Sequence, residues 1–266
     1  MHNRAALFVL TSIFLAACGG GGGGGSTTPP VSNPAPQPTS TAAPQPTPTP
    51  VANTSLSFYL PLASGNTWTF ATGAKFSDMG SGPLQCQCPG NGVQMEQVAL
   101  YQANSSTIFG SLFFTKTTGN TVLTNLVGVE NDSGNSNITI SSNAQYPDGV
   151  PVMDDNPFVN ESWNDGAGDT STITAVGGTL MLPNNTQVID IATDVVSGNF
   201  NPITWSFAKG VGFTSIGVGN QSTNLTSFFV STTNSHDSAR KAASVLPLHG
   251  KLGKIDLNTT LAPLFK

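Results

Sequence analysis

TSTITAVGGTLML (residues 170–182) and TQVIDIATDVV (residues 186–196) are two stretches rich in β-branched residues, and only Pro183-Asn184-Asn185 separates them. Val, Ile and Thr favour strands, whereas Pro and Asn are typical turn residues. Apolar residues do not recur at helical spacing in either stretch. We therefore expect a long antiparallel hairpin here.

Short β-prone stretches divided by turns continue outward from this hairpin through residues 55–233. A second hairpin is predicted around Asn104-Ser105-Ser106, between residues 92–103 and 107–117. Further strands are expected at residues 58–62, 67–70, 120–130, 136–141, 203–207, 213–218 and 225–232. Many short strands at fairly even spacing predict an all-β domain, built as an antiparallel sandwich, an open barrel or a curved sheet.

Residues 1–17 have the character of a targeting segment. Arg4 supplies a positive charge, and the apolar run Ala5–Ala17 is broken only by Thr11 and Ser12. Thirteen residues are too few for a membrane-spanning helix, which takes about 20. The segment therefore predicts a secretory signal peptide.

Leu15-Ala16-Ala17-Cys18 resembles the bacterial lipobox, in which the cysteine is acylated and becomes the first residue of the mature chain. The resemblance implies lipidation of Cys18, with palmitate-type chains that give stable membrane anchoring at about 0.8 kcal/mol per buried CH₂. Gly19 replaces the aspartate that retains many such lipoproteins at the inner membrane, so the resemblance implies the outer membrane of the cell envelope. The alternative is an ordinary cleaved signal peptide with an incidental Cys18.

Residues 18–54 are expected to form a disordered tether. A row of glycines from Gly19 to Gly25 precedes a segment of Pro, Thr, Ser, Ala and Gln that contains too little apolar surface to fold. At ~3.1 Å per residue, about 25 residues of polyproline character reach on the order of 80 Å. After the domain at 55–233, residues 234–266 are expected to be either an added edge element or a loosely ordered tail.

Two motifs near opposite ends of the domain carry a family resemblance. FYLPLASGNTWTF (residues 58–70) and FAKGVGF (residues 207–213) resemble elements of a broad group of bacterial lipoproteins of uncharacterised function. We expect Trp68 to be a core aromatic, and Gly210 and Gly212 to form a tight turn or bulge between strands. The alternative is a ligand-binding role for these residues.

The charge composition argues against a nucleic-acid partner. Only 9% of the residues are charged, and the net charge of −5 becomes −6 when Arg4 is removed with the signal peptide. The remaining basic residues are scattered before the C-terminal segment, whereas a nucleic-acid surface needs clustered Lys and Arg.

Cys86 and Cys88 are the cysteines that remain once Cys18 is assigned to lipid. An even pair in an exported protein suggests a disulfide. The alternatives are free or intermolecular thiols and a metal or redox site. Zinc needs four ligands, and His236 and His249 are the only histidines after the signal peptide, so no metal site is predicted.

The acidic residues show no pattern that identifies a calcium site or a catalytic pair. The loop at 154–169 could supply calcium ligands, so we compared it with the twelve-residue EF-hand loop, which has a glycine at position 6 and a glutamate at position 12. If Gly166 is placed at position 6, position 12 is Thr172, so the loop does not match. There is no G-x-S-x-G nucleophile motif. Glu96, Glu130 and Glu161 are the only glutamates, and the sequence singles out no partner for a glycosidase pair. We predict no catalytic residues and no cofactor.

These observations predict a membrane-anchored lipoprotein with a non-catalytic β-rich domain that serves binding or envelope structure. The expected partners are the membrane, through the N-terminal lipid, and an envelope protein. A carrier of lipid or another hydrophobic ligand is the second hypothesis, because a curved sheet that does not close over its own core leaves an apolar cavity. An envelope hydrolase is the third.

Overall fold

The structure is a computed structural model, and it describes residues 59–85, 92, 94–118, 122–130, 138–141, 150–164, 169–198, 200–231, 248–253 and 255–266. The chain divides into two units, residues 1–45 and residues 46–266. All described residues belong to the second unit. The predictions for Cys18, Cys86, Cys88 and the tether therefore lie outside the described residues.

The described residues form fourteen strands and a short C-terminal helical segment. The strands are β1 (Thr67–Phe70), β2 (Lys75–Gln85), β3 (Gln94–Tyr101), β4 (Ile108–Thr118), β5 (Val122–Glu130), β6 (Ile138–Ser141), β7 (Val150–Asp154), β8 (Ser162–Asn164), β9 (Thr170–Met181), β10 (Gln187–Ser197), β11 (Ile203–Ala208), β12 (Gly212–Val218), β13 (Gln221–Phe229) and β14 (Leu248–Gly253). The helical segment comprises α1 (Leu257–Leu261) and the 3₁₀ turn η2 (Ala262–Phe265).

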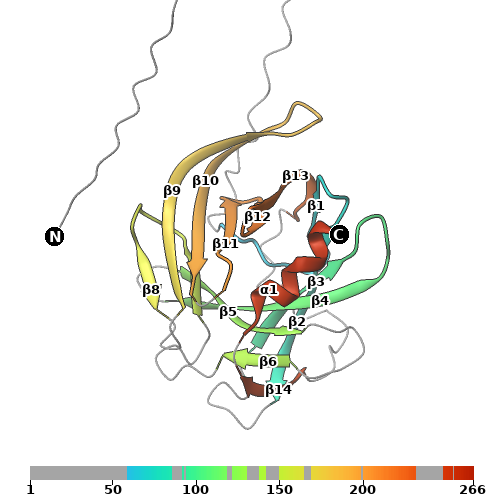
Figure 1. Ribbon diagram of the computed structural model, residues 1–266, viewed down its shortest axis with the longest axis vertical. Coiled ribbons are helices and arrows are strands. Elements are labelled where there is room, and N and C mark those ends of the chain that lie inside the picture. The colour runs from blue at the N-terminus through green and yellow to red at the C-terminus, as the bar shows by residue number, and fades with distance from the viewer. Residues whose placement is uncertain are drawn as a thin grey trace, which may run out of the picture. The chain divides into compact units, whose positions relative to one another are not determined.

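The strands make one curved, mainly antiparallel sheet (Figure 1). Its order is β14-β6-β5-β4-β3-β2-β1-β13-β12-β11-β10-β9-β8, and β7 pairs with β5 beside β6. The parallel pairings are those of β14 with β6 and, over two residues, with β2. The all-β prediction is confirmed in its curved-sheet form, and both predicted hairpins are present as β3–β4 and β9–β10.

The strand expected at residues 58–62 is wrong for its described part, because residues 59–62 are not in a strand. Pro61 has no N–H to donate to a neighbouring strand. Its carbonyl accepts a hydrogen bond from the Asn66 side chain at 2.7 Å, within a turn in which Asn66 N–H donates to the Ala63 carbonyl. The aromatic and aliphatic side chains of this segment are buried without joining the sheet.

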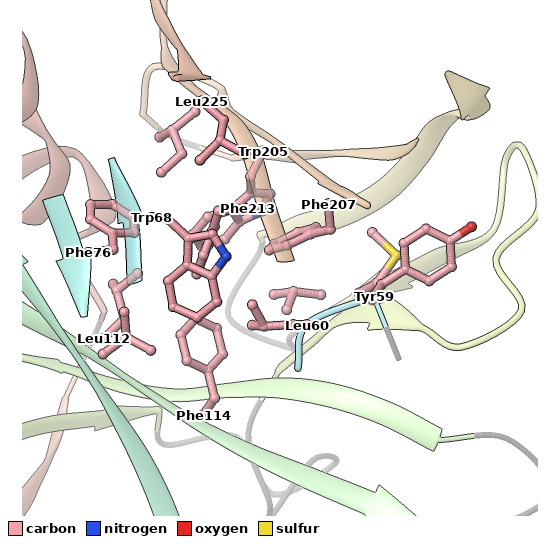
Figure 2. Close-up of a cluster of buried hydrophobic side chains, with 14 of the residues drawn as sticks. Tyr59, Leu60, Trp68, Phe76, Leu112, Phe114, Trp205, Phe207, Phe213 and Leu225 are labelled. Carbon is pink, nitrogen blue, oxygen red and sulfur yellow. The ribbon is translucent and has the colours of Figure 1, made fainter. Parts of the chain in front are cut away.

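Aromatic side chains from distant strands fill the inner face of the curved sheet (Figure 2). Phe213 is at the centre: its ring centroid lies 5.4 Å from that of Trp68, 5.2 Å from Phe76 and 5.0 Å from Phe207. These four rings are almost fully buried. Edge-on and tilted ring pairs at these distances add about 0.5–1.5 kcal/mol each beyond the burial of their area.

The two sequence motifs meet in this core. The Trp68 indole N–H donates to the Val211 carbonyl at 2.6 Å, across 143 residues of sequence. Gly212 has a φ of 95°, and a Cβ placed on it would lie only 2.6 Å from Trp68 Nε1. The expected core position of Trp68 and the tight turn at Gly210 and Gly212, between β11 and β12, are therefore confirmed.

The C-terminal segment packs against the same sheet. α1 contacts β4 and β5, and η2 contacts β13. Leu257, Leu261 and Leu264 are buried in the core, while Asp256 caps α1 by accepting the Thr259 N–H at 3.0 Å. Within the described residues, no helix has the length and apolar character needed to cross a membrane.

Candidate functional site

The second half of β9, from Thr174 to Met181, is largely exposed. In Figure 1 β9 and β10 form a long arc that extends past the neighbouring strands. The side chains of Ser171 and Ile173, near the start of β9, are buried, whereas six of the eight residues from Thr174 to Met181 are exposed. β9 is thus exposed between Ile173 and Leu182, whereas Leu182 and Val188, close to the turn of the hairpin, are buried in the core.

Local irregularities bend this hairpin. The β9–β10 register shifts at three places, between Val188 and Ile191, between Ile191 and Thr193, and between Thr193 and Asp194. Gly177 and Asp190 adopt positive φ values of 75° and 54° near the first two. Bulges bend a strand and increase its twist. They also make an edge less able to pair indiscriminately with other strands, so a partner must match the bend.

Among the described residues, the outer edge of β9 has no pairing strand along most of its length. β8 pairs only with residues 170–172, and the Asn160 N–H extends this contact to the Ile173 carbonyl. From Thr174 to Met181 no described strand pairs with this edge. Residues 170–182 also contain no charged residue and no proline, which are two further features that keep edge strands from pairing.

Two apolar side chains are exposed on this segment. Val176 is 40% exposed and Met181 is 47% exposed. The segment therefore offers unpaired backbone donors and acceptors together with apolar contact area. That combination suits the addition of a polypeptide strand, in which backbone hydrogen bonds give affinity and side chains give specificity.

A cluster of ionisable residues lies in the opposite half of the sheet, on β2, β3 and β4. Asp78 pairs with Val98, and Glu96 pairs with Phe114. Because residues two apart on a strand share a face, Asp78, Glu96 and Lys116 all lie on the face that carries Val98 and Phe114. Asp78 is 1% exposed, and one oxygen of each carboxylate, Asp78 Oδ2 and Glu96 Oε2, is buried without a hydrogen-bond partner.

The pKa values of this cluster are shifted toward the neutral forms. Burial raises the pKa of Asp78 to about 6, against the hydrogen bonds it accepts from the backbone of Gly80 and Ala63. Burial raises the pKa of Glu96 to about 7, and the negative charge of Asp78 adds to the shift. Burial lowers the pKa of Lys116 to about 8, although both carboxylates oppose this shift.

Asp194 is a buried carboxylate in the other half of the sheet, and both of its oxygens accept hydrogen bonds. Its oxygens accept from the Ser171 hydroxyl at 2.8 Å and from the Trp205 indole N–H at 2.9 Å. Burial raises the pKa of Asp194 to about 7. These bonds join β9, β10 and β11 near the start of β9, so Asp194 supports the base of the hairpin.

Lys209 of the FAKGVGF motif is half-buried and holds separate segments together. Its ammonium group donates to the Asp155 carbonyl at 3.3 Å and lies 5.9 Å from the Tyr59 ring centroid. Burial raises the pKa of Tyr59, and the charge of Asp190 adds to this shift. This arrangement fixes the segment around Tyr59 next to the β11–β12 turn.

The acidic loop that was considered as a source of calcium ligands is described only in part, at residues 154–164 and 169. In the acidic loop, the Asp154 carboxylate accepts the Asn156 N–H at 2.6 Å. No group of three or more His, Cys, Asp or Glu residues that could hold a metal occurs among the described residues. Sequence inspection missed the Asp78–Glu96–Lys116 cluster, because its members are 18 and 20 residues apart and only strand register aligns them.

No family model, curated protein or solved structure matches this chain.

Proposed function

We propose that this chain is a lipid-anchored protein of the bacterial outer membrane whose β domain binds another envelope protein and does not catalyse a reaction. Cys18 carries the lipid, and residues 19–54 are the tether. The observation that supports a binding role best is the open, uncharged edge of β9 from Thr174 to Met181.

The chemistry of that edge favours a protein over an acyl chain as the partner. Exposed N–H and C=O groups on a strand edge need hydrogen-bonding partners, and a hydrocarbon chain has none to offer. A second strand satisfies these groups and also covers Val176 and Met181.

The lipid-carrier hypothesis has less support. A carrier needs an apolar cavity, whereas Trp68, Phe76 and Phe213 contact one another on the inner face of the sheet. These rings pack against one another on the face where a carrier would need an apolar cavity.

Purification of the tagged protein from envelope membranes separates these hypotheses. The proposal predicts a protein that co-purifies with the wild type and is lost from the Val176→Asp/Met181→Asp variant. A matched control carries Met79→Asp and Phe229→Asp, which change exposed apolar residues on other strands. Acyl chains found by mass spectrometry in the domain cut from its lipid anchor, without a hairpin-dependent protein, would favour the carrier instead.

Metabolic labelling with a clickable palmitate tests the anchor. The wild type should be labelled, and Cys18→Ala should not. A variant that remains labelled contradicts the assignment of Cys18.

A further inference from the structure

We propose that the turn at residues 158–161 and the open edge of β9 form one docking surface for an extended segment of the partner protein. The segment is about eight residues long and uncharged along β9, and its end at the turn carries an apolar and a basic residue. The surface includes the β9 edge, so this binding mode rests on the proposed function.

β8 and the turn before it occupy the start of the row beside β9. β8 pairs with residues 170–172, and in Figure 1 it lies along the first part of β9. The Ile173 N–H donates to the Glu161 carbonyl at 2.8 Å, and the Asn160 N–H donates to the Ile173 carbonyl at 2.8 Å. From Thr174 onward no described strand occupies this row. A strand added there continues the row of β8, and one of its ends meets the turn.

The remaining part of the row sets the length and character of the added segment. Residues Thr174 to Met181 face it, and at about 3.3 Å per residue this part of β9 takes an extended segment of about eight residues. None of these β9 residues is charged. Cross-strand neighbours with charges would therefore find no oppositely charged partner, so an uncharged segment fits best.

The turn at residues 158–161 presents apolar side chains on a hydrogen-bonded backbone. The Glu161 N–H donates to the Phe158 carbonyl at 3.1 Å, and the Phe158 N–H donates to the Glu161 carboxylate at 3.4 Å. Asn160 has a φ of 71°, as the third position of a type II turn requires. Four of the six large apolar side chains exposed in the described part of the chain lie on this turn or on β9: Phe158, Val159, Val176 and Met181. Such a gathering of exposed apolar side chains marks an interaction site.

Negative charge around the turn favours a basic residue at this end of the segment. Asp154 and Asp155 precede the turn, and Glu161 ends it. Burial raises the pKa of Glu161 and the charge of Asp154 adds to the shift, so these two carboxylates lie close together. Against these three acidic residues, the Lys209 ammonium group donates to the Asp155 carbonyl at 3.3 Å. The excess of negative charge attracts a Lys or Arg side chain and repels anionic lipid headgroups.

Photo-crosslinking of the full-length protein in cells tests this surface. A photoreactive amino acid replaces Phe158 in one variant and Val176 in another, and both positions are exposed, so the core is left unchanged. Mass spectrometry of the crosslinked peptides should identify the same partner from both positions. The two captured sites should lie within about eight residues of each other, with a Lys or Arg next to the site captured from Phe158.

Substitutions in the turn should weaken capture from Val176. Phe158→Ser/Val159→Ser should lower the yield by about tenfold, which is the effect of losing one large buried apolar side chain in the complex. Phe229→Ser, which changes an exposed aromatic residue on β13, is the control and should leave the yield unchanged. Glu161→Gln keeps an acceptor for the Phe158 N–H, so it should lower the yield less than Glu161→Lys does. Equal yields from the two Glu161 variants would contradict a basic residue at the turn.

The outcomes separate this surface from the proposed function. Capture from Val176 without capture from Phe158, or capture of a different protein from Phe158, would overturn the shared surface and leave the proposed function in place. Phospholipid crosslinked to Phe158 would also overturn it, because the turn would then contact a membrane. No capture from Val176 would overturn both.

Discussion

The packing of Trp68 in the core depends on a single residue, Gly212. The glycine at φ 95° lets the backbone lie against the indole ring, and the Val211 carbonyl next to it accepts the indole N–H. Sequence reasoning predicted a core tryptophan and a glycine turn separately. Their direct contact could not be predicted, because 143 residues separate Trp68 from Val211 and only the pairing of β1 with β13 and β12 with β13 brings them together.

We expect Gly212→Ala to lower the free energy of unfolding by about 3–5 kcal/mol, from backbone strain of about 1–3 kcal/mol and overlap with the indole ring of similar size. Gly65→Ala is the matched control, since Gly65 has a φ of 91° and nothing within 4 Å of an added Cβ. Urea unfolding of both variants separates strain from overlap. Equal losses would show that contact with Trp68 is not the reason for the glycine.

At the scale of elements, the β9–β10 hairpin was predictable and β2 was not. The hairpin has β-branched residues on both sides of a Pro-Asn-Asn turn. β2 contains Gly80, Gly82 and Pro83, which resemble turn residues, and the register shift between Asp78 and Gly80 absorbs this irregularity. The open edge of β9 was not predictable either, because it depends on where β8 stops pairing.

The exposed side chains of the hairpin should contribute little to stability, whereas its buried side chains should contribute more. Val176→Ser/Met181→Ser should change the free energy of unfolding by less than about 1 kcal/mol, since both side chains are exposed. Leu182→Ala, at a buried position in the same hairpin, should cost about 2–4 kcal/mol. Chemical denaturation measures both, and a large loss in the double variant would mean that the segment belongs to the core.

Hydrogen exchange should also distinguish the exposed edge of β9 from the buried strands. Amides of residues 174–181 that point away from β10 should be protected at least about 100-fold less than those of β12, because exposed edges open at little free-energy cost. Mass spectrometry of the deuterated protein checks this. Strong protection of the edge in the purified protein would mean that it is already covered.

The folded protein as a whole should be more stable at mildly acidic pH than at neutral pH. Asp78, Glu96 and Asp194 have folded-state pKa values raised to about 6, 7 and 7, so the folded chain binds more protons than the unfolded chain between about pH 4 and pH 7. Their stabilising contribution is present at low pH and is lost as the pH rises through these values. We expect the free energy of unfolding to be at least about 1 kcal/mol greater at pH 5 than at pH 7.5.

Lys116 should make the free energy of unfolding rise with pH above about pH 8, which is opposite to the effect of the three carboxylates. Its folded-state pKa is lowered to about 8, so its contribution is lost as the pH falls through 8 and recovers toward pH 10. The free energy of unfolding, measured with urea from pH 5 to pH 10, should therefore have a minimum near pH 7–8. In Glu96→Gln this free energy should fall less steeply between pH 5 and the minimum. A wild-type stability that rises steadily from pH 5 to pH 7.5 would contradict these assignments.

Site-specific photo-crosslinking in living cells is the most direct test of the proposed binding role. A photoreactive amino acid at Val176 should yield a discrete crosslinked protein, whereas the same group at Phe229, which is also exposed, should not. The crosslink should disappear when Met181→Asp is added. Crosslinks of equal yield at both positions, or no crosslink at Val176, would contradict a protein partner at the β9 edge.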